Sequence, residues 1–317
     1  MPLRIIFFGT PEFAVPTLTK LMDSPDIEIS GIVTQPDARR GRGNQLLAPP
    51  VKTVALERGL ACPIWQPERL KKDPAVLDAL AAAAADVFVV VAYGQILSQK
   101  ILDLPRHGCI NVHGSLLPKY RGAAPIQWAI ANGETITGIT TMQMDAGIDT
   151  GAMLLKASVE ILPEDNSETL SAKLAVIGGD LLLQTLADLS QICPVPQDDT
   201  AANYAPIITK EQFILDWCQS AQHIHQQIRA FYPNCYTTYQ GQRLKVLAAT
   251  PELRTDSGNS DVIPGTITAL HKGVGFGVQT GAGNLVVTTV QPAGKKIQSG
   301  WDFANGARLQ VGHGLTL

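Results

Sequence analysis

The feature that most constrains the fold is a regular alternation of short apolar segments with helical ones over the first 115 residues. Continuous apolar runs, which predict strands, cover residues 3–8, 27–34, 87–92 and 108–113. Helical patterns lie between them at 50–58, 74–85 and 96–102, and Thr10 and Pro11 after the first run are typical of a helix start. Strands that alternate with helices pair in parallel through right-handed crossovers. The sequence therefore predicts an open α/β sheet that binds ligands beyond the carboxyl ends of its strands.

The pattern changes after about residue 190. Residues 194–203 are polar, contain two prolines and show no periodicity, as in a linker. One helix is predicted beyond it, at 220–230, followed by short strands at 235–239, 244–248, 265–270, 275–280 and 284–290. Several short strands separated by glycine-containing turns favour a small β-barrel. We therefore expect an α/β domain over 1–190, a linker over 191–208 and a barrel over 209–317.

Charge is divided unevenly between these parts. Residues 209–317 carry nine Lys or Arg and six Asp or Glu, a net charge of +3, whereas 1–208 carry sixteen and twenty-two, a net charge of −6; the sum is the −3 of the whole chain. This balance argues against a protein that coats nucleic acid over its whole surface. A mildly basic barrel suits local contact with an RNA backbone, and it equally suits an ordinary solvated surface.

Several classes of protein are disfavoured. The five cysteines are an odd number without a Cys-x-x-Cys pair, so neither a disulfide framework nor a zinc site is indicated, and reduced thiols suit the cytoplasm. No uninterrupted apolar run reaches about 18 residues, so no membrane helix is expected. Gly9 stands alone after the first strand, without the glycine spacing of a dinucleotide site.

Candidate catalytic groups gather between residues 108 and 151. Strand alternation puts Asn111 and His113 on one face of the fourth predicted strand, and a glycine-rich turn at 144–151 carries Asp149. If the fold brings Asp149 over the strand end, it can orient His113. An amide, an imidazole and a carboxylate together suit acyl transfer. A hydrogen-bonded structural pair of Asn111 and His113 is the alternative.

The run Asn-Val-His-Gly-Ser-Leu-Leu-Pro-Lys-Tyr-Arg-Gly-Ala-Ala-Pro-Ile at 111–126 resembles the signature of the formyltetrahydrofolate-dependent formyltransferases. Further segments of the chain share the resemblance in order, at 8–13, 34–37, 90–94 and 291–296. The resemblance implies a Rossmann-like formyltransferase domain followed by a small barrel of the oligonucleotide-binding (OB) type. It agrees with the α/β and barrel halves that the residues themselves predict.

The resemblance also implies an activity: transfer of the formyl group of 10-formyltetrahydrofolate to the amino group of methionyl initiator tRNA, by a monomer that uses no metal. Asn111, His113 and Asp149 match the catalytic positions of the family, and Asp145 is left with a structural role in its turn. Two segments match the folate site: Ser115, Leu116, Leu117 and Pro118, and Val90, Ala92, Tyr93 and Gly94. The expected tRNA contacts are Arg40 and Arg42 in a flexible loop, whose Ala38 and Arg39 depart from some relatives, and Lys295 and Lys296.

Two other functions remain open at this stage. A formyltransferase or hydrolase that acts on a small-molecule amine or on water would use the same three residues, but the arginine-rich loop would then lack a purpose. A non-catalytic RNA-binding module would leave the acidic first domain and the Asn, His and Asp unexplained.

Overall fold

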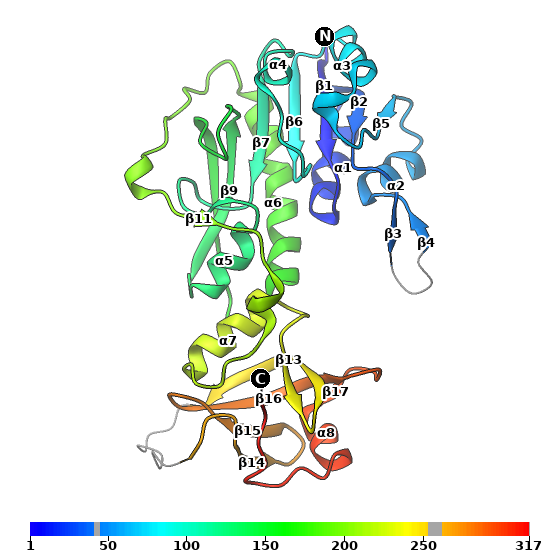
Figure 1. Cartoon of the computed structure of the whole chain (residues 1–317). Helices are drawn as coiled ribbons and strands as arrows, with labels where there is room; N and C mark the ends of the chain where they lie inside the picture. The colour runs from blue at the N-terminus through cyan, green and yellow to red at the C-terminus, as the bar shows by residue number, and fades with distance from the viewer. Residues whose placement is uncertain (41–44, 253–261, 317) are drawn as a thin grey trace. The chain divides into compact units, whose positions relative to one another are not determined.

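The computed structural model of the protein describes residues 1–40, 45–252 and 262–316 (Figure 1). Contacts between residues divide the chain into two compact units. The first consists of residues 1–125, 136–160 and 171–205, and the second of 126–135, 161–170 and 206–317. Each unit is thus assembled from segments that are distant in the sequence.

A seven-stranded sheet forms the centre of the first unit. Its order is β10 (Met153–Glu160), β9 (Ile136–Gln143), β7 (Cys109–His113), β6 (Val87–Val91), β1 (Leu3–Gly9), β2 (Ile27–Val33) and β5 (Ile64–Trp65) (Figure 1). The strands from β7 to β5 pair in parallel, which confirms the predicted α/β sheet. β9 and β10 add an antiparallel edge. The sequence did not predict β10, whose polar residues alternate with apolar ones as in a half-exposed edge strand.

Helices cover both faces of this sheet. Their bounds are α1 (Val15–Asp23), α2 (Pro50–Glu57), α3 (Pro74–Ala82), α4 (Gln99–Leu102) and α6 (Ser167–Ala187), with 3-10 turns η1 (Glu12–Ala14) and η2 (Leu70–Lys72). Phe8 and Phe88 pack on one face with residues of η2, α3 and α4. On the other face α6 approaches the sheet closely, because a Cβ at Gly178 would lie 2.9 Å from Val112 in β7.

The first helix begins later than the sequence predicts. Pro11 precedes the 3-10 turn η1, and α1 starts only at Val15. Thr10 does not cap the helix, because its hydroxyl donates to the Tyr93 carbonyl at 3.1 Å and accepts from the Gln35 backbone N–H at 3.4 Å. Thr10 thereby joins the carboxyl ends of β1, β2 and β6, where ligands were expected to bind.

α6 is the one helix, among the described residues, whose length and composition would allow it to cross a membrane. Half of its apolar window is buried inside the fold, and Lys173 and Asp180 interrupt that window. The burial indicates a helix of the protein core that packs on the sheet. Its charged residues keep it from forming an uninterrupted apolar run.

The segment 191–208, expected to link two domains, has defined structure. Val195 exchanges backbone hydrogen bonds with Met153, a 3-10 turn η3 spans Asp199–Ala201, and β11 (Tyr204–Ala205) pairs with β8 (Arg121–Gly122). Contacts assign the chain as far as Ala205 to the first unit. The polar, proline-containing stretch 194–203 therefore packs against the first unit and is not a free linker.

The second unit is built on an antiparallel sheet in the order β12 (Tyr236–Tyr239), β13 (Gln242–Glu252), β16 (Asn284–Pro292), β15 (Gly275–Gln279) and β14 (Ile267–His271), with β17 (Gln298–Ser299) beside β16 (Figure 1). The tail closes the sheet into a barrel, because Thr316 bridges to β12 and Gly314 bridges to Thr266 at the start of β14. The unit's helices are α5 (Pro125–Ala131), a 3-10 turn η4 (Lys210–Phe213), α7 (Ala221–Ala230) and α8 (Gly300–Gly306). The predicted barrel strands are confirmed.

The remaining element is a hairpin of β3 (Ala38–Arg40) and β4 (Gln45–Leu47) in the first unit. It occupies the position of the expected arginine-rich loop. Residues 41–44, including Arg42, lie outside the described part of the chain.

Candidate active site

Asn111 and His113 lie at the carboxyl end of β7, on the same face of the strand. His113 is buried, with 5% of its surface exposed, and Asn111 is half-buried. Because β7 is flanked by β6 and β9, the two side chains have a fixed frame on both sides.

Asp149 joins them from the loop between β9 and β10. Asn111 Nδ2 donates to Asp149 Oδ1 at 3.3 Å, and Asp149 Oδ2 lies 3.6 Å from His113 Nδ1. The backbone N–H of Gly122 also donates to Oδ2, at 2.8 Å. The structure thus brings together the three residues that the sequence proposed as catalytic.

The hydrogen bonds of His113 define which nitrogen can move a proton. Nε2 lies 2.9 Å from the carbonyl oxygen of Tyr120, and a carbonyl oxygen only accepts, so Nε2 carries the hydrogen in the neutral ring. Nδ1, which faces Asp149, is then free to take up a proton. An imidazolium formed there would lie beside a carboxylate, an arrangement that stabilises the charge.

Gln197 fixes the loop that carries Asp149. Asp149 has a positive φ of +54°, which is rare for a residue with a side chain. Gln197 Nε2 donates to the carbonyl oxygens of Asp149 and Gly151, both at 2.8 Å. Its Oε1 accepts from Arg121 Nε at 3.0 Å. The glutamine therefore ties both sides of the turn to the segment after β7.

Arg121 holds the Gln197 side chain in place and is itself paired with Asp199. Its side chain is buried, with Nη2 2.8 Å from Asp199 Oδ1. Burial by itself would lower the pKa of the guanidinium, but the interactions with Asp199 and Tyr204 outweigh it and raise the pKa, so the group stays charged. We name Gln197, Arg121 and Asp199 together the Gln197 clamp.

The sequence did not predict the Gln197 clamp. Arg121 lies within the signature at 111–126, which is the only sequence feature that points to it. Gln197 and Asp199 fall in the stretch interpreted as a linker. Asp145, by contrast, has the structural role expected of it: its Oδ1 accepts from the Gly147 N–H at 3.0 Å and from the Thr150 hydroxyl at 2.7 Å.

The four residues after β7 that match a folate segment differ in exposure. Ser115 and Leu117 are buried, and the Ser115 hydroxyl donates to the Lys119 carbonyl at 2.6 Å. Leu116 and Pro118 keep half-exposed side chains. Within this segment, Leu116 and Pro118 therefore have more side-chain surface accessible than Ser115 and Leu117.

The segment after β6 has an unusual backbone. Ala92 and Gly94 both have positive φ, +48° and +87°, while Val90 is buried in the core. Tyr93 is also buried, and its hydroxyl has no hydrogen-bond partner among the described residues. Burial raises the pKa of Tyr93, so the phenol stays neutral.

A cavity of about 180 Å³ lies next to Asp149. It is lined by Gln95, Ile96, Leu97, Met142, Met144, Asp145, Ala146, Gly147, Ile148 and Asp149. Ile96 and Ile148 are exposed, at 78% and 61%, and add apolar surface to the wall of the cavity. A mostly apolar slot beside an amide and a carboxylate suits a flat heterocycle such as a pterin ring.

The candidate RNA-contacting residues fall in both units. Arg40 belongs to β3 in the first unit, and Lys295 and Lys296 are exposed in the turn after β16 in the second unit. The side chain of Arg40 and the whole of Arg42 are outside the described part of the chain. Within that part, no group of three or more His, Cys, Asp or Glu is arranged to hold a metal ion.

Comparison with known families places both halves of the chain. Residues 3–186 match the formyl transferase family, and residues 207–308 match its C-terminal domain. The methionyl-tRNA formyltransferase of Trichormus variabilis is 55% identical, with 98% of both chains covered. That of Thermosynechococcus vestitus is 54% identical and covers 98% of this chain and 97% of its own.

Solved structures share the fold at low identity. An N-formyltransferase from Helicobacter canadensis, in complex with folinic acid and dTDP-3-aminofucose, is 17% identical with a TM-score of 0.65, over 92% of this chain and 100% of its own. HypX from Aquifex aeolicus, in complex with tetrahydrofolic acid, is 15% identical with a TM-score of 0.63, over 98% of this chain and 48% of its own.

Proposed function

The chain belongs to the formyl transferase family, and from that premise we propose that it transfers the formyl group of 10-formyltetrahydrofolate to the amino group of methionyl initiator tRNA. Relatives that are 52–55% identical over nearly the full chain are methionyl-tRNA formyltransferases, which supports this acceptor. The observation that carries the chemistry is the meeting of Asn111, His113 and Asp149 at the end of β7.

Each of the three residues has a separate role in the proposed acyl transfer. When bound, the folate supplies an activated formyl group on its N10 nitrogen. Asn111 shares one amide hydrogen with Asp149 and can donate the other to the formyl oxygen, which gains negative charge as the amine attacks. His113 takes the proton of the attacking amine at Nδ1 and returns it to the leaving nitrogen. Asp149 stabilises the charged imidazolium between these steps.

The donor fits the residues around the cavity beside Asp149. Leu97 and Met144 would pack on a flat ring. Leu116 and Pro118 would line the path of the donor past β7, with Ser115 and Leu117 shaping the loop from within. Arg40 in β3 and Arg42, two positions later in the sequence, together with Lys295 and Lys296 in the barrel, would contact the RNA.

We infer that the enzyme acts in the cytoplasm as a monomer that does not enter a membrane. The described part of one chain supplies Asn111, His113, Asp149 and the Gln197 clamp, so no second copy is needed to complete the site. All five cysteines are unpaired, as suits a reducing compartment. Sedimentation at increasing protein concentration tests the monomer, and a dimer at micromolar concentration would contradict it.

The decisive experiment follows a labelled formyl group from 10-formyltetrahydrofolate in the presence of purified protein. Methionyl initiator tRNA, methionyl elongator tRNA, free methionine and water compete as acceptors in one reaction. We expect the label on the initiator tRNA. Release of formate to water, or transfer to the small amine, would preserve the role of the three residues and overturn the acceptor.

A further inference from the structure

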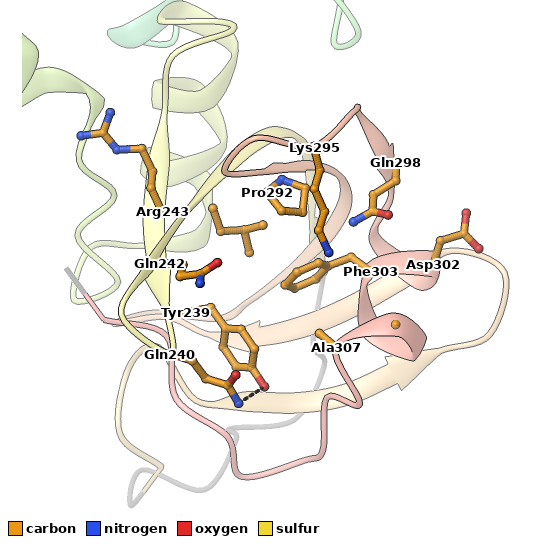
Figure 2. A pocket seen from close by; sticks show the side chains of 12 residues that line it. Tyr239, Gln240, Gln242, Arg243, Pro292, Lys295, Gln298, Asp302, Phe303 and Ala307 are labelled. Carbon is orange, nitrogen blue, oxygen red and sulfur yellow. Dashed lines mark hydrogen bonds between the residues drawn. The ribbon is translucent and has the colours of Figure 1, made fainter.

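The barrel unit contains a hollow of about 290 Å³, and apart from Lys295 its lining residues have no role in the proposed reaction (Figure 2). The turn between β12 and β13, the end of β16 and helix α8 enclose it. Its floor is formed by Tyr239 and Phe303, whose rings meet edge to face with centroids 5.9 Å apart. Figure 2 shows Lys295 extending toward the Phe303 ring and Gln298 turned into the same space. The hollow thus combines an aromatic floor with a cation and an amide.

Positive charge gathers around this hollow. Of the nine Lys and Arg in residues 209–317, Arg243 and Lys295 line the hollow, and Lys296 and Arg308 directly follow residues that line it. Lys245 lies on the same strand as Arg243 and pairs with Gln291 of β16. Asp302 is the one carboxylate among the lining residues. In a chain of net charge −3, this local excess is the electrostatic pattern of a polyanion contact.

Arg243 is already oriented for stacking. Its guanidinium carbon lies 4.0 Å from the centroid of the Tyr236 ring, while the side chain remains exposed. An arginine held over an aromatic ring keeps the outer face of its plane available, and unstacked RNA bases pack on such planes as well as on aromatic rings. The combination favours a nucleotide over a simple anion such as phosphate.

We propose that this hollow binds one unstacked nucleotide of the transfer RNA. The base enters against Phe303 and Pro292, the carboxamides of Gln242 and Gln298 reach its edge because an amide can both donate and accept, and Lys295 meets a flanking phosphate. The volume is at the small end of ligand sites, roughly 300–1,000 Å³, which suits a single nucleotide. The proposal rests on the proposed function, since that function supplies the RNA.

Gly306 offers a way to fill the hollow without disturbing the barrel. It is the last residue of α8 and lines the hollow, and a Cβ placed on it meets no atom within 4 Å. In Gly306→Leu the KM for methionyl-tRNA should rise about five- to a hundredfold, as expected for one lost stacked base, with kcat unchanged. Gly314→Leu is the matched control: its Cβ is equally free but it does not line the hollow, and its KM should stay at the wild-type value.

The salt dependence of tRNA binding distinguishes a contact with the base from a contact with a phosphate. Lys295→Met should reduce the slope of log Kd for methionyl-tRNA against log salt by about one unit, because one phosphate contact is lost. Gly306→Leu removes no charge and should weaken binding at every salt concentration with the slope unchanged. Lys272→Met, at an exposed lysine in the turn between β14 and β15, is the charge-matched control.

The two proposals can fail separately. If Lys295→Met alters the salt slope while Gly306→Leu binds like the wild type, the surface attracts RNA without holding a base and the nucleotide site is overturned. If the wild type binds methionyl-tRNA in a Gly306-dependent way but does not formylate it, the nucleotide site stands and the proposed function fails.

Discussion

At the scale of single residues, the candidate site depends on holding Asp149 in a conformation that its backbone disfavours. A left-handed φ costs a residue with a side chain on the order of 1 kcal/mol or more, so surrounding contacts must compensate. Gln197 and the Gly122 N–H provide them, one at the backbone of Asp149 and one at its carboxylate. The position of the carboxylate over β7 is therefore set by one side chain, that of Gln197, and by one backbone N–H, that of Gly122.

Asn111 is the clearest test of the proposed oxyanion contact. Asn111→Ala should lower kcat about a hundred- to a thousandfold, the usual effect of removing one such donor. Asn111→Asp keeps the shape but replaces the amide donor by a second carboxylate, and should be impaired at least as strongly. Both are measured at saturating folate and tRNA. Turnover close to that of the wild type in either variant would remove Asn111 from the mechanism.

Gln197 should act on kcat through Asp149. Gln197→Leu keeps the size of the side chain but releases the carbonyls of Asp149 and Gly151, and a small misplacement of Asp149 should reduce kcat roughly ten- to a hundredfold. KM for the tRNA should not change. Gln184→Leu, at an exposed position of α6, is the control. An equal loss of stability in both variants with normal kcat would show that Gln197 has no positioning role.

At the scale of elements, helix α6 supports the strand that carries the site. Gly178 lies against Val112, between Asn111 and His113 in sequence, and a Cβ at Gly179 would lie 3.2 Å from the backbone of Thr17 in α1. Two adjacent glycines inside a helix reduce its intrinsic stability by about 1 kcal/mol each relative to alanine. Gly178 allows the close approach of α6 to the sheet, and Gly179 allows its close approach to α1, despite that cost.

Gly178→Val should lower the free energy of unfolding by about 1–3 kcal/mol, because the added methyl groups have no space beside Val112. The measurement is a urea titration of the full-length protein. Ala172→Val adds similar volume at an exposed position of the same helix and should cost only a few tenths of a kcal/mol. If Gly178→Val destabilises the protein no more than Ala172→Val does, packing against Val112 does not limit this position.

At the scale of the whole molecule, contacts divide the chain into two compact units, and a buried histidine in the second unit makes stability depend on pH. His225 on α7 couples the second unit to pH: burial lowers its pKa from 6.5 to about 4, and the charge of Arg229 adds to the effect. The unfolded chain binds a proton below about pH 6.5 that the folded chain does not bind until about pH 4. The stability of this unit therefore falls as the pH falls through that interval.

The urea midpoint of the second unit, followed by the fluorescence of buried Trp217, should decrease between about pH 7 and about pH 5. His225→Gln should make that decrease smaller, because the variant has no proton to take up at this position. His223→Gln, two residues away on the exposed side of α7, should retain the wild-type pH dependence. The same pH dependence in all three proteins would exclude His225 as its source.

Much of the fold and part of the site follow from the sequence because local patterns encode them. Period-two and continuous apolar runs placed the parallel strands and the barrel strands, and alternation along 109–113 put Asn111 and His113 on one face. Asp149 was a hypothesis from its glycine-rich turn, and the family resemblance then matched it to a catalytic position. The start of the first helix was wrong by several residues, because Thr10 bonds to neighbouring strand ends instead of capping.

By itself, the sequence determined which groups the site contains and that they follow strands of an α/β sheet. Only the tertiary structure decided that Gln197, from a stretch with the composition of a linker, would hold Asp149, and that the end of β16 and helix α8 would enclose a hollow with Tyr239. The reason is physical: periodicity records which side of an element faces the core, whereas contacts between segments tens of residues apart depend on how whole elements pack, and a polar side chain shows no local sign of the partner it will meet.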